Sequence, residues 1–114
     1  MKDKLKAIAY TRVSTSAQST LGQATELKNV HGYDVVKIYK EKTSGYGKSI
    51  TERVELQKSI EHLRSDRSID TLMISEISRL GRNTKEVLSL IEELEKEEIP
   101  LYIHNLGCTI GGTE

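Results

Sequence analysis

Large aromatic side chains are scarce in this sequence, which has no Trp, no Phe and five Tyr among 114 residues. The core of the folded domain must therefore consist mainly of aliphatic side chains, the most abundant apolar residues left. The single cysteine, Cys108, excludes an intramolecular disulfide and is typical of a protein in a reducing cytosol. There is one proline and no low-complexity segment, so the composition is that of an ordinary globular domain.

Long apolar runs are also missing. No run approaches the roughly 20 residues that a membrane-spanning helix needs. The first four residues, Met1 to Lys4, lack the apolar stretch of a signal peptide. A chain of this length fits one domain. We therefore expect a single soluble, cytoplasmic domain over residues 1–114, with no membrane partner.

The sequence also lacks an excess of positive charge, because Lys plus Arg and Asp plus Glu both number 17. A protein that binds nucleic acid unaided usually has a basic excess, since much of the affinity comes from neutralising phosphates. Either DNA is not the partner, or another segment supplies most of the affinity. The placement of arginine is more informative than its number: four of the six lie in the segments discussed below, at Arg12, Arg53, Arg79 and Arg82.

Apolar periodicity predicts strands that alternate with helices. Apolar, β-branched runs predict strands at residues 7–13, 33–39, 69–74 and 101–104. Helical spacing predicts helices at residues 21–30, after Ser49, and at about 84–98 before Pro100. Residues 107–112 show no clear periodicity. Strict alternation favours an α/β fold of three layers, a mostly parallel sheet of four to five strands with helices on both faces.

Two of the helices have predicted caps and inner faces. Ser49 with Glu52, and Asn83 with Glu86, have the spacing of a capping box. The inner face of the helix after Ser49 is expected to carry Leu56, Ile60 and Leu63. The inner face of the last helix is expected to carry Val87, Leu88, Ile91, Leu94 and Glu95.

The unusual polar residues follow the predicted strands. In open parallel sheets, ligands bind at the carboxyl ends of the strands. Arg12 and Ser14 end the first strand, two residues apart, so on extended backbone their side chains leave the same face. Arg53 ends the segment after the second strand. Arg79 and Arg82 follow the third strand and precede a helix. We expect one hydroxyl and up to four guanidinium groups to meet at one edge.

This set of side chains suits attack on a phosphodiester. The transition state gathers negative charge on the non-bridging oxygens, and catalysis there is mainly positioning and electrostatic stabilisation. A serine hydroxyl must be activated to act as the nucleophile. The three histidines, His31, His62 and His104, lie outside the segments that carry Ser14 and the arginines. A Ser-His-Asp hydrolase site is therefore poorly supported, and an arginine-dominated site is favoured.

These residues resemble the serine site-specific recombinase family of resolvases and invertases, over about residues 7–107. The resemblance rests on Tyr10-x-Arg12-Val13-Ser14-Thr15, Gln23, Ser44-Gly45, Glu52-Arg53 and Arg79-Leu80-Gly81-Arg82. It implies a resolvase-like catalytic domain in which Ser14 attacks the DNA backbone, forming a 5′-phosphoserine link and releasing a 3′-hydroxyl. Arg12, Arg79 and Arg82 would then stabilise the phosphate and orient Ser14.

The resemblance also places Arg53 and Gln23 at the site, with the Tyr10 hydroxyl nearby. It implies that four subunits cut all strands, exchange them and rejoin them, without ATP or an obligatory metal and without a small-molecule substrate. Family members normally continue into a long dimer-forming helix and a separate DNA-binding domain, neither of which is expected within residues 1–114. Such a fragment should be largely monomeric and bind double-stranded DNA weakly, which accounts for its zero net charge.

The sequence departs from the family at Ser78, where Asp commonly precedes the Arg79–Arg82 motif. The group that takes the Ser14 proton is therefore open. Glu76, two residues before Ser78, could face the same way, and Glu41, after the second strand, matches another acidic position of the family. Arginine itself is a poor base at neutral pH. Ser78 also leaves open a relative that assembles but no longer cuts DNA.

Other interpretations remain beside these. Ser14 can be read as a loop or capping serine, Arg53 as a helix-surface residue, and Gln23 as polar surface. The segment from Gly45 to Ser49 resembles the end of a phosphate-binding loop, but Lys42 stands where its first glycine should be, which favours an active-site loop. Cys108 and the histidines are interpreted as structural, because no two are spaced as metal ligands. A doubly wound regulatory module, such as a signalling receiver, would need an acidic cluster after the first strand, where this sequence has Arg12 and Ser14.

Overall fold

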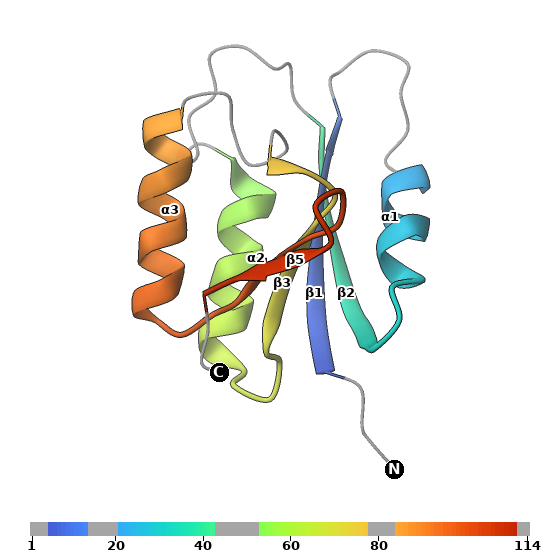
Figure 1. The fold of residues 1–114 in the computed structure, drawn as a ribbon, viewed down its shortest axis with the longest axis horizontal. Helices are drawn as coiled ribbons and strands as arrows, with labels where there is room; N and C mark the ends of the chain where they lie inside the picture. The colour runs from blue at the N-terminus through green and yellow to red at the C-terminus, as the bar shows by residue number, and fades with distance from the viewer. Residues whose placement is uncertain (1–4, 14–20, 43–52, 78–83, 112–114) are drawn as a thin grey trace.

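The computed structural model describes residues 5–13, 21–42, 53–77 and 84–111. A five-stranded sheet in the order β2-β1-β3-β4-β5 lies between helices, as Figure 1 shows. The strands are β1 (Leu5–Val13), β2 (Tyr33–Lys42), β3 (Thr71–Ile74), β4 (Leu101–Ile103) and β5 (Cys108–Ile110). The helices are α1 (Leu21–Lys28), α2 (Val54–Ser65) and α3 (Thr84–Lys96). The predicted three-layer α/β fold is confirmed, with α1 on one face of the sheet and α2 and α3 on the other.

The first four strands are parallel, and β5 is antiparallel to β4. The register of β1 with β2 shifts between Ala7 and Ile8 and then continues to Val13, which lies opposite Lys42. Strand β5 lies in the segment without periodicity. It is three residues long and has no fully buried residue, and only Ile110 packs against the core, so the sequence shows no periodicity that would mark it.

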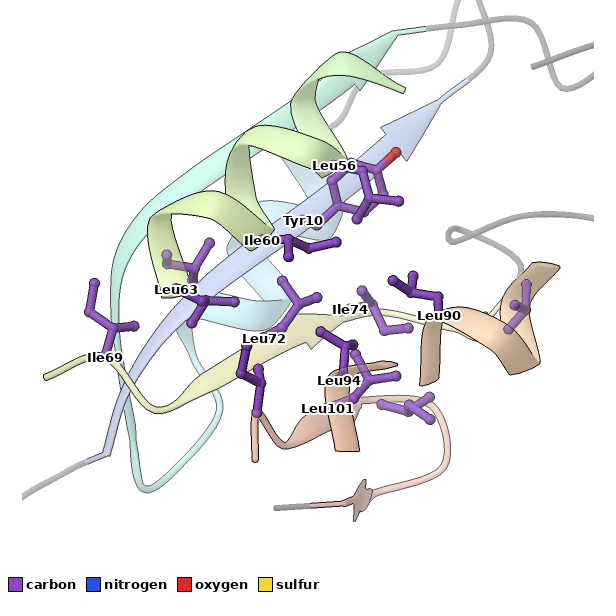
Figure 2. Close-up of a cluster of buried hydrophobic side chains, with 14 residues drawn as sticks. Tyr10, Leu56, Ile60, Leu63, Ile69, Leu72, Ile74, Leu90, Leu94 and Leu101 are labelled. Atoms are coloured by element: carbon purple, nitrogen blue, oxygen red, sulfur yellow. The ribbon is translucent and has the colours of Figure 1, made fainter. Parts of the chain in front are cut away.

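The larger part of the core fills the space between the sheet and the helices α2 and α3 (Figure 2). Every second residue of the central strands faces this side, which follows from the alternation of side chains along a strand. Except for Tyr10 all its buried members are aliphatic, as the lack of Phe and Trp requires. These members are Ile8, Tyr10, Leu56, Ile60, Leu63, Ile69, Leu72, Ile74, Val87, Leu90, Leu94, Ile99, Leu101 and Ile103.

The face covered by α1 has a smaller core of Ala7, Ala9, Leu27 and Met73. The rings of Tyr33 and Tyr102 pack against it, with their centroids 5.2 Å apart. The small alanine side chains on β1 leave room for these large rings. The rings therefore cover part of the sheet face that α1 alone does not cover.

Helix α2 begins later than the capping box predicts. The predicted cap required a helix start just after Ser49, whereas the helix starts at Val54 with Arg53 at the N-cap. The Arg53 side chain makes no capping hydrogen bond. The predicted start of the helix is therefore wrong. The side chains of Ser49 and Glu52 lie outside the described residues.

Helix α3 ends in a Schellman motif, two residues before the predicted end. The Ile99 amide donates to the Leu94 carbonyl at 2.9 Å, and the Glu98 amide donates to the Glu95 carbonyl at 3.0 Å. Glu98 takes the left-handed conformation, with φ of 61°, at the position where glycine is usual. The predicted capping residue Asn83 lies outside the described residues.

The inner face of α3 also differs from the prediction. Leu88 was expected inside and is 55% exposed, and Glu95 is exposed as well. Leu90, which was not expected inside, is buried together with Val87 and Leu94. Positions 87, 90 and 94 follow the spacing of three and four residues that one helix face requires, and Leu88 lies about 100° away from Val87. Among the described residues, no helix is long and apolar enough to cross a membrane.

Candidate active site at the carboxyl edge of the sheet

Three segments that carry predicted site residues leave from one edge of the sheet. Strands β1, β2 and β3 are parallel and adjacent, so their carboxyl ends lie at the same edge (Figure 1). Ser14 follows Val13, the last residue of β1, directly in the chain. The predicted edge is therefore confirmed as the place from which these segments start.

Tyr10, on β1, is fully buried beneath this edge. Its hydroxyl donates a hydrogen bond of 3.1 Å to Oε1 of Glu41, the last residue but one of β2. In Figure 2 the Tyr10 ring lies at the end of the core nearest the carboxyl end of β1. The tyrosine was predicted to be a core residue with its hydroxyl near the site, and the burial of its ring is confirmed.

Glu41 is buried, and its carboxylate caps α2 from the neighbouring strand. Oε2 accepts a hydrogen bond from the Glu55 amide at 3.3 Å, and Oε1 accepts one from the Leu56 amide at 3.2 Å. These amides are among the first of the helix, which have no partner within it. A negative charge at a helix N-terminus also interacts favourably with the helix dipole. Glu41 thereby performs the task that the N-cap side chain usually performs.

Arg53 is only 1% exposed, so its interpretation as a helix-surface residue is wrong. Its guanidinium lies close enough to the Tyr10 hydroxyl to affect its ionisation. Burial and the nearby Glu41 carboxylate raise the pKa of Tyr10 well above its ordinary value, and the Arg53 charge partly opposes this. Burying an arginine costs free energy unless a partner or a ligand compensates it. Its position therefore calls for a specific role.

Arg12 lies two residues beyond Tyr10 on β1 and is also buried, at 7% exposure. It is opposite Glu41 in the register of β1 and β2. By the alternation of side chains it leaves the same face of the strand as Tyr10, the face that α2 and α3 cover. The structure thus brings together Tyr10, Glu41 and Arg53, and places Arg12 beside them at the same edge.

The other predicted site residues are not placed. Ser14, Arg79 and Arg82 lie outside the described residues, as do Ser78 and the glycine-rich loop. Gln23 is the third residue of α1, and its side chain is not described. Glu76, one of the two acidic residues considered for proton transfer, is partly buried just after β3.

Two histidines have tyrosine hydroxyl groups as partners. Nδ1 of His62 is 3.0 Å from the Tyr39 hydroxyl, and Nδ1 of His104 is 3.3 Å from the Tyr102 hydroxyl. Within the described part of the chain, no three His, Cys, Asp or Glu side chains are grouped so that they could hold a metal ion. Among the described residues, the side chains brought together at this edge are those of Tyr10, Arg12, Glu41 and Arg53.

The capping function of Glu41 was missed by sequence reasoning. The sequence showed Glu41 only as an acidic residue after a strand. The amides that it binds are 14 and 15 residues away, so no local pattern announces the contact.

Comparison with known proteins gives a consistent result. The family model for the resolvase N-terminal domain matches residues 7–112. The chain is 35% identical over 95 residues to the transposon Tn552 resolvase of Staphylococcus aureus, covering 83% of this chain and 44% of the relative. It is 34% identical over 90 residues to a resolvase of Clostridium perfringens, covering 79% of this chain and 44% of the relative. The chain thus spans less than half the length of these curated relatives.

Solved structures agree with the fold. The N-terminal catalytic domain of TP901-1 integrase superposes with a TM-score of 0.75 at 26% identity, covering 91% of this chain and 80% of that one. A resolvase family site-specific recombinase from Streptococcus pneumoniae superposes with a TM-score of 0.73 at 27% identity, covering 93% and 76%.

Proposed function

The chain belongs to the serine site-specific recombinase family of resolvases and invertases, and from this premise we propose that Ser14 is its nucleophile in the cutting and rejoining of DNA. The Ser14 oxygen forms a bond to the backbone phosphorus as the bond to the 3′ oxygen breaks. The proton that Ser14 loses balances the proton that the 3′ oxygen gains, so the 3′ oxygen departs as a hydroxyl. The phosphoserine ester conserves the bond energy, so the reverse step rejoins DNA without ATP.

In this proposal the arginines replace a metal in balancing charge. Arg12, Arg79 and Arg82 contact the phosphate oxygens, with guanidinium groups suited to bidentate recognition. Arg53 and Gln23 complete the site, and Tyr10 supports it from the core. Transition-state charge is then stabilised by groups that are already in place before reaction, which is the larger share of catalysis in phosphoryl transfer.

The observation that carries this proposal is the burial of two arginines, Arg12 and Arg53, beneath the edge where β1 ends and Ser14 begins. An arginine in an exposed ion pair contributes little to stability, so pairing on the surface does not explain arginines that are buried. A buried guanidinium at the carboxyl edge of a parallel sheet is instead suited to an anionic ligand. This arrangement gives no support to the alternative of a receiver module, which needs an acidic cluster after the first strand, where this chain has Arg12 and Ser14.

We further propose that residues 1–114 form one catalytic domain and that the whole protein contains parts that dimerise it and bind DNA. The zero net charge predicts weak DNA binding by residues 1–114 alone. The full protein would act as a dimer and tetramer on DNA in the cytoplasm.

A trapping experiment tests the nucleophile. The protein expressed from the whole reading frame is incubated with DNA that flanks its gene, and the reaction is stopped with denaturant. We expect a covalent protein–DNA adduct on a denaturing gel. It should be absent in Ser14→Ala and present in Ser16→Ala, a matched change in the same segment. An adduct at wild-type level in Ser14→Ala would refute the proposal.

The same experiment tests the alternative of a relative that no longer cuts DNA. That alternative predicts specific DNA binding by the wild type without any adduct. Ser78→Asp then restores the residue common in the family, and an adduct in that variant alone would identify Ser78 as the cause.

A further inference from the structure

Tyr10, Glu41 and Arg53 form a buried group, here called the edge cluster, which joins β1, β2 and the start of α2. Its centre is the Glu41 carboxylate, which accepts three hydrogen bonds. Oε1 accepts from the Tyr10 hydroxyl and the Leu56 amide, and Oε2 accepts from the Glu55 amide. A carboxylate offers about four lone-pair positions. Donors from the protein itself therefore occupy most of the acceptor capacity of Glu41.

The contacts of Glu41 determine where α2 begins. Glu55 and Leu56 are the second and third residues of the helix, whose amides an N-cap side chain normally satisfies. Here the N-cap residue is Arg53, and its side chain does not cap. Glu41 takes over that task through its hydrogen bonds with the Glu55 and Leu56 amides. The helix start is fixed to β2 instead of to its own N-cap.

Arg53 is the residue that this contact places most directly. It immediately precedes the first turn of α2 and is buried next to Tyr10, which itself donates to Glu41. Leu56, in the same turn, is fully buried in the core. The start of α2 is thus held by two kinds of contact: hydrogen bonds from its amides to the Glu41 carboxylate, and packing of Leu56 in the core. Arg53 is the residue directly before this turn.

We propose that Glu41 is a positioning residue of the recombination reaction: it holds the first turn of α2 against the carboxyl end of β2 and so sets the position of Arg53. The inference rests on the proposed function. It also implies that Glu41 is not the proton acceptor for Ser14, because its carboxylate already accepts three hydrogen bonds from the protein and serves to position those donors. The Ser14 proton goes to another group.

The test compares four variants of the full protein: Glu41→Gln, Glu41→Ala, Arg53→Ala and the double variant Glu41→Ala with Arg53→Ala. The rate of adduct formation is measured across the neutral and alkaline pH range, with Glu61→Gln on the exposed side of α2 as a matched control. Glu41→Gln keeps a side-chain oxygen that can accept hydrogen bonds from α2. We expect it to slow adduct formation by less than roughly tenfold and to leave the shape of the pH profile unchanged, whereas loss of a general base costs roughly 10²–10⁴-fold.

The double variant separates positioning of Arg53 from a general structural role. If Glu41 acts through Arg53, removing it after Arg53 is gone should cost little more, so the double variant should cut at roughly the rate of Arg53→Ala. In Glu41→Ala, hydrogen exchange should accelerate at the amides of Glu55 and Leu56 before it does so in α3. Thermal unfolding of each variant shows whether it folds.

Two results would overturn the inference while leaving the proposed function intact. One is a loss of a hundredfold or more in Glu41→Gln with an altered pH profile, which would make Glu41 a proton-transfer group. The other is a double variant whose fold-loss in the rate of adduct formation equals the product of the two single losses, which would show that Glu41 and Arg53 act independently. If the wild type itself forms no adduct, the proposed function fails instead, and this inference fails with it.

Discussion

The Tyr10 hydroxyl and the Glu41 carboxylate share a hydrogen bond of 3.1 Å in the interior, directly beneath the edge where β1 and β2 end. The bond links the core of the domain to the candidate site, because Glu41 also caps α2. Removing either group would therefore disturb stability and site geometry together.

Tyr10→Phe removes the hydroxyl and leaves the ring. We expect a loss of about 2 kcal/mol in the free energy of unfolding, since hydrogen bonds to charged groups contribute roughly 1.5–3 kcal/mol. Denaturant unfolding at neutral pH measures it. Tyr39→Phe, which removes a hydroxyl near the part-buried His62, serves as the control and should cost less. Equal losses would show that the Glu41 contact has no special weight.

The same variant gives a pH prediction. The pKa of Tyr10 is raised in the folded protein, chiefly by burial. The stabilising effect of the neutral hydroxyl is complete below the unfolded pKa of about 10 and is lost as pH rises above it. Above that pH, wild-type stability should fall more steeply than that of Tyr10→Phe, by up to about 1.4 kcal/mol per pH unit. Parallel stability curves for the two proteins would contradict this.

Glu98→Gly should stabilise the protein by about 0.5–1 kcal/mol. Glu98 has φ of 61° at the end of α3, where glycine adopts the conformation without strain. The matched control is Glu92→Gly in the middle of the helix, which should destabilise by about 1 kcal/mol. Opposite signs in thermal unfolding support the left-handed end of α3. Destabilisation by both changes would contradict it.

Arg64 joins α2 to α3 and gives a salt-dependent prediction. Its Nε is 2.7 Å from Glu97 Oε1 and its Nη2 is 2.8 Å from Glu97 Oε2, a bidentate pair, and Nη2 is also 2.9 Å from Glu93 Oε2. Arg64→Met should cost about 1 kcal/mol at low salt and less at high salt, since a third of the side chain is exposed. The exposed pair of Lys58 with Glu55 provides the control, and Lys58→Met should have little effect.

The Arg64 pair also predicts how stability falls in acid. Hydrogen bonding from Arg64 lowers the pKa of Glu97 in the folded protein. Its contribution is therefore present above the ordinary glutamate pKa and is lost as pH falls through the lowered one. Stability curves of the wild type and Arg64→Met should converge in acid. A constant difference at all pH values would exclude this linkage.

Leu88 and Leu90 show where sequence reasoning failed on the fold. Strands β1 to β4 were predicted within a few residues because each contains a short apolar or β-branched segment, whereas β5 was not predicted. The inner face of α3 was not, because Val87, Leu88, Leu90, Ile91 and Leu94 offer two overlapping helical stripes, and only packing against the sheet selects one. Leu90→Ala should cost about 2–4 kcal/mol and Leu88→Ala less than about 0.5 kcal/mol in denaturant unfolding. The reverse order would contradict the described packing.

At the site, the sequence showed which residues to expect but not which residues contact one another. Arg12 and Arg53 were predicted from motifs and are buried at the predicted edge. The start of α2 was misplaced because its cap comes from Glu41, on another strand. Contacts between residues distant in the chain carry no periodicity, so local patterns cannot supply them.

The most direct test of the central claim is to identify the residue that carries the DNA. The trapped adduct is digested with nuclease and trypsin, and the peptide of residues 13–28 is analysed by fragmentation mass spectrometry. This peptide holds Ser14 together with Ser16 and Ser19 as internal controls. The account predicts a phosphate-linked nucleotide remnant on Ser14 alone. A remnant on another residue, with Ser14 unmodified, would contradict it.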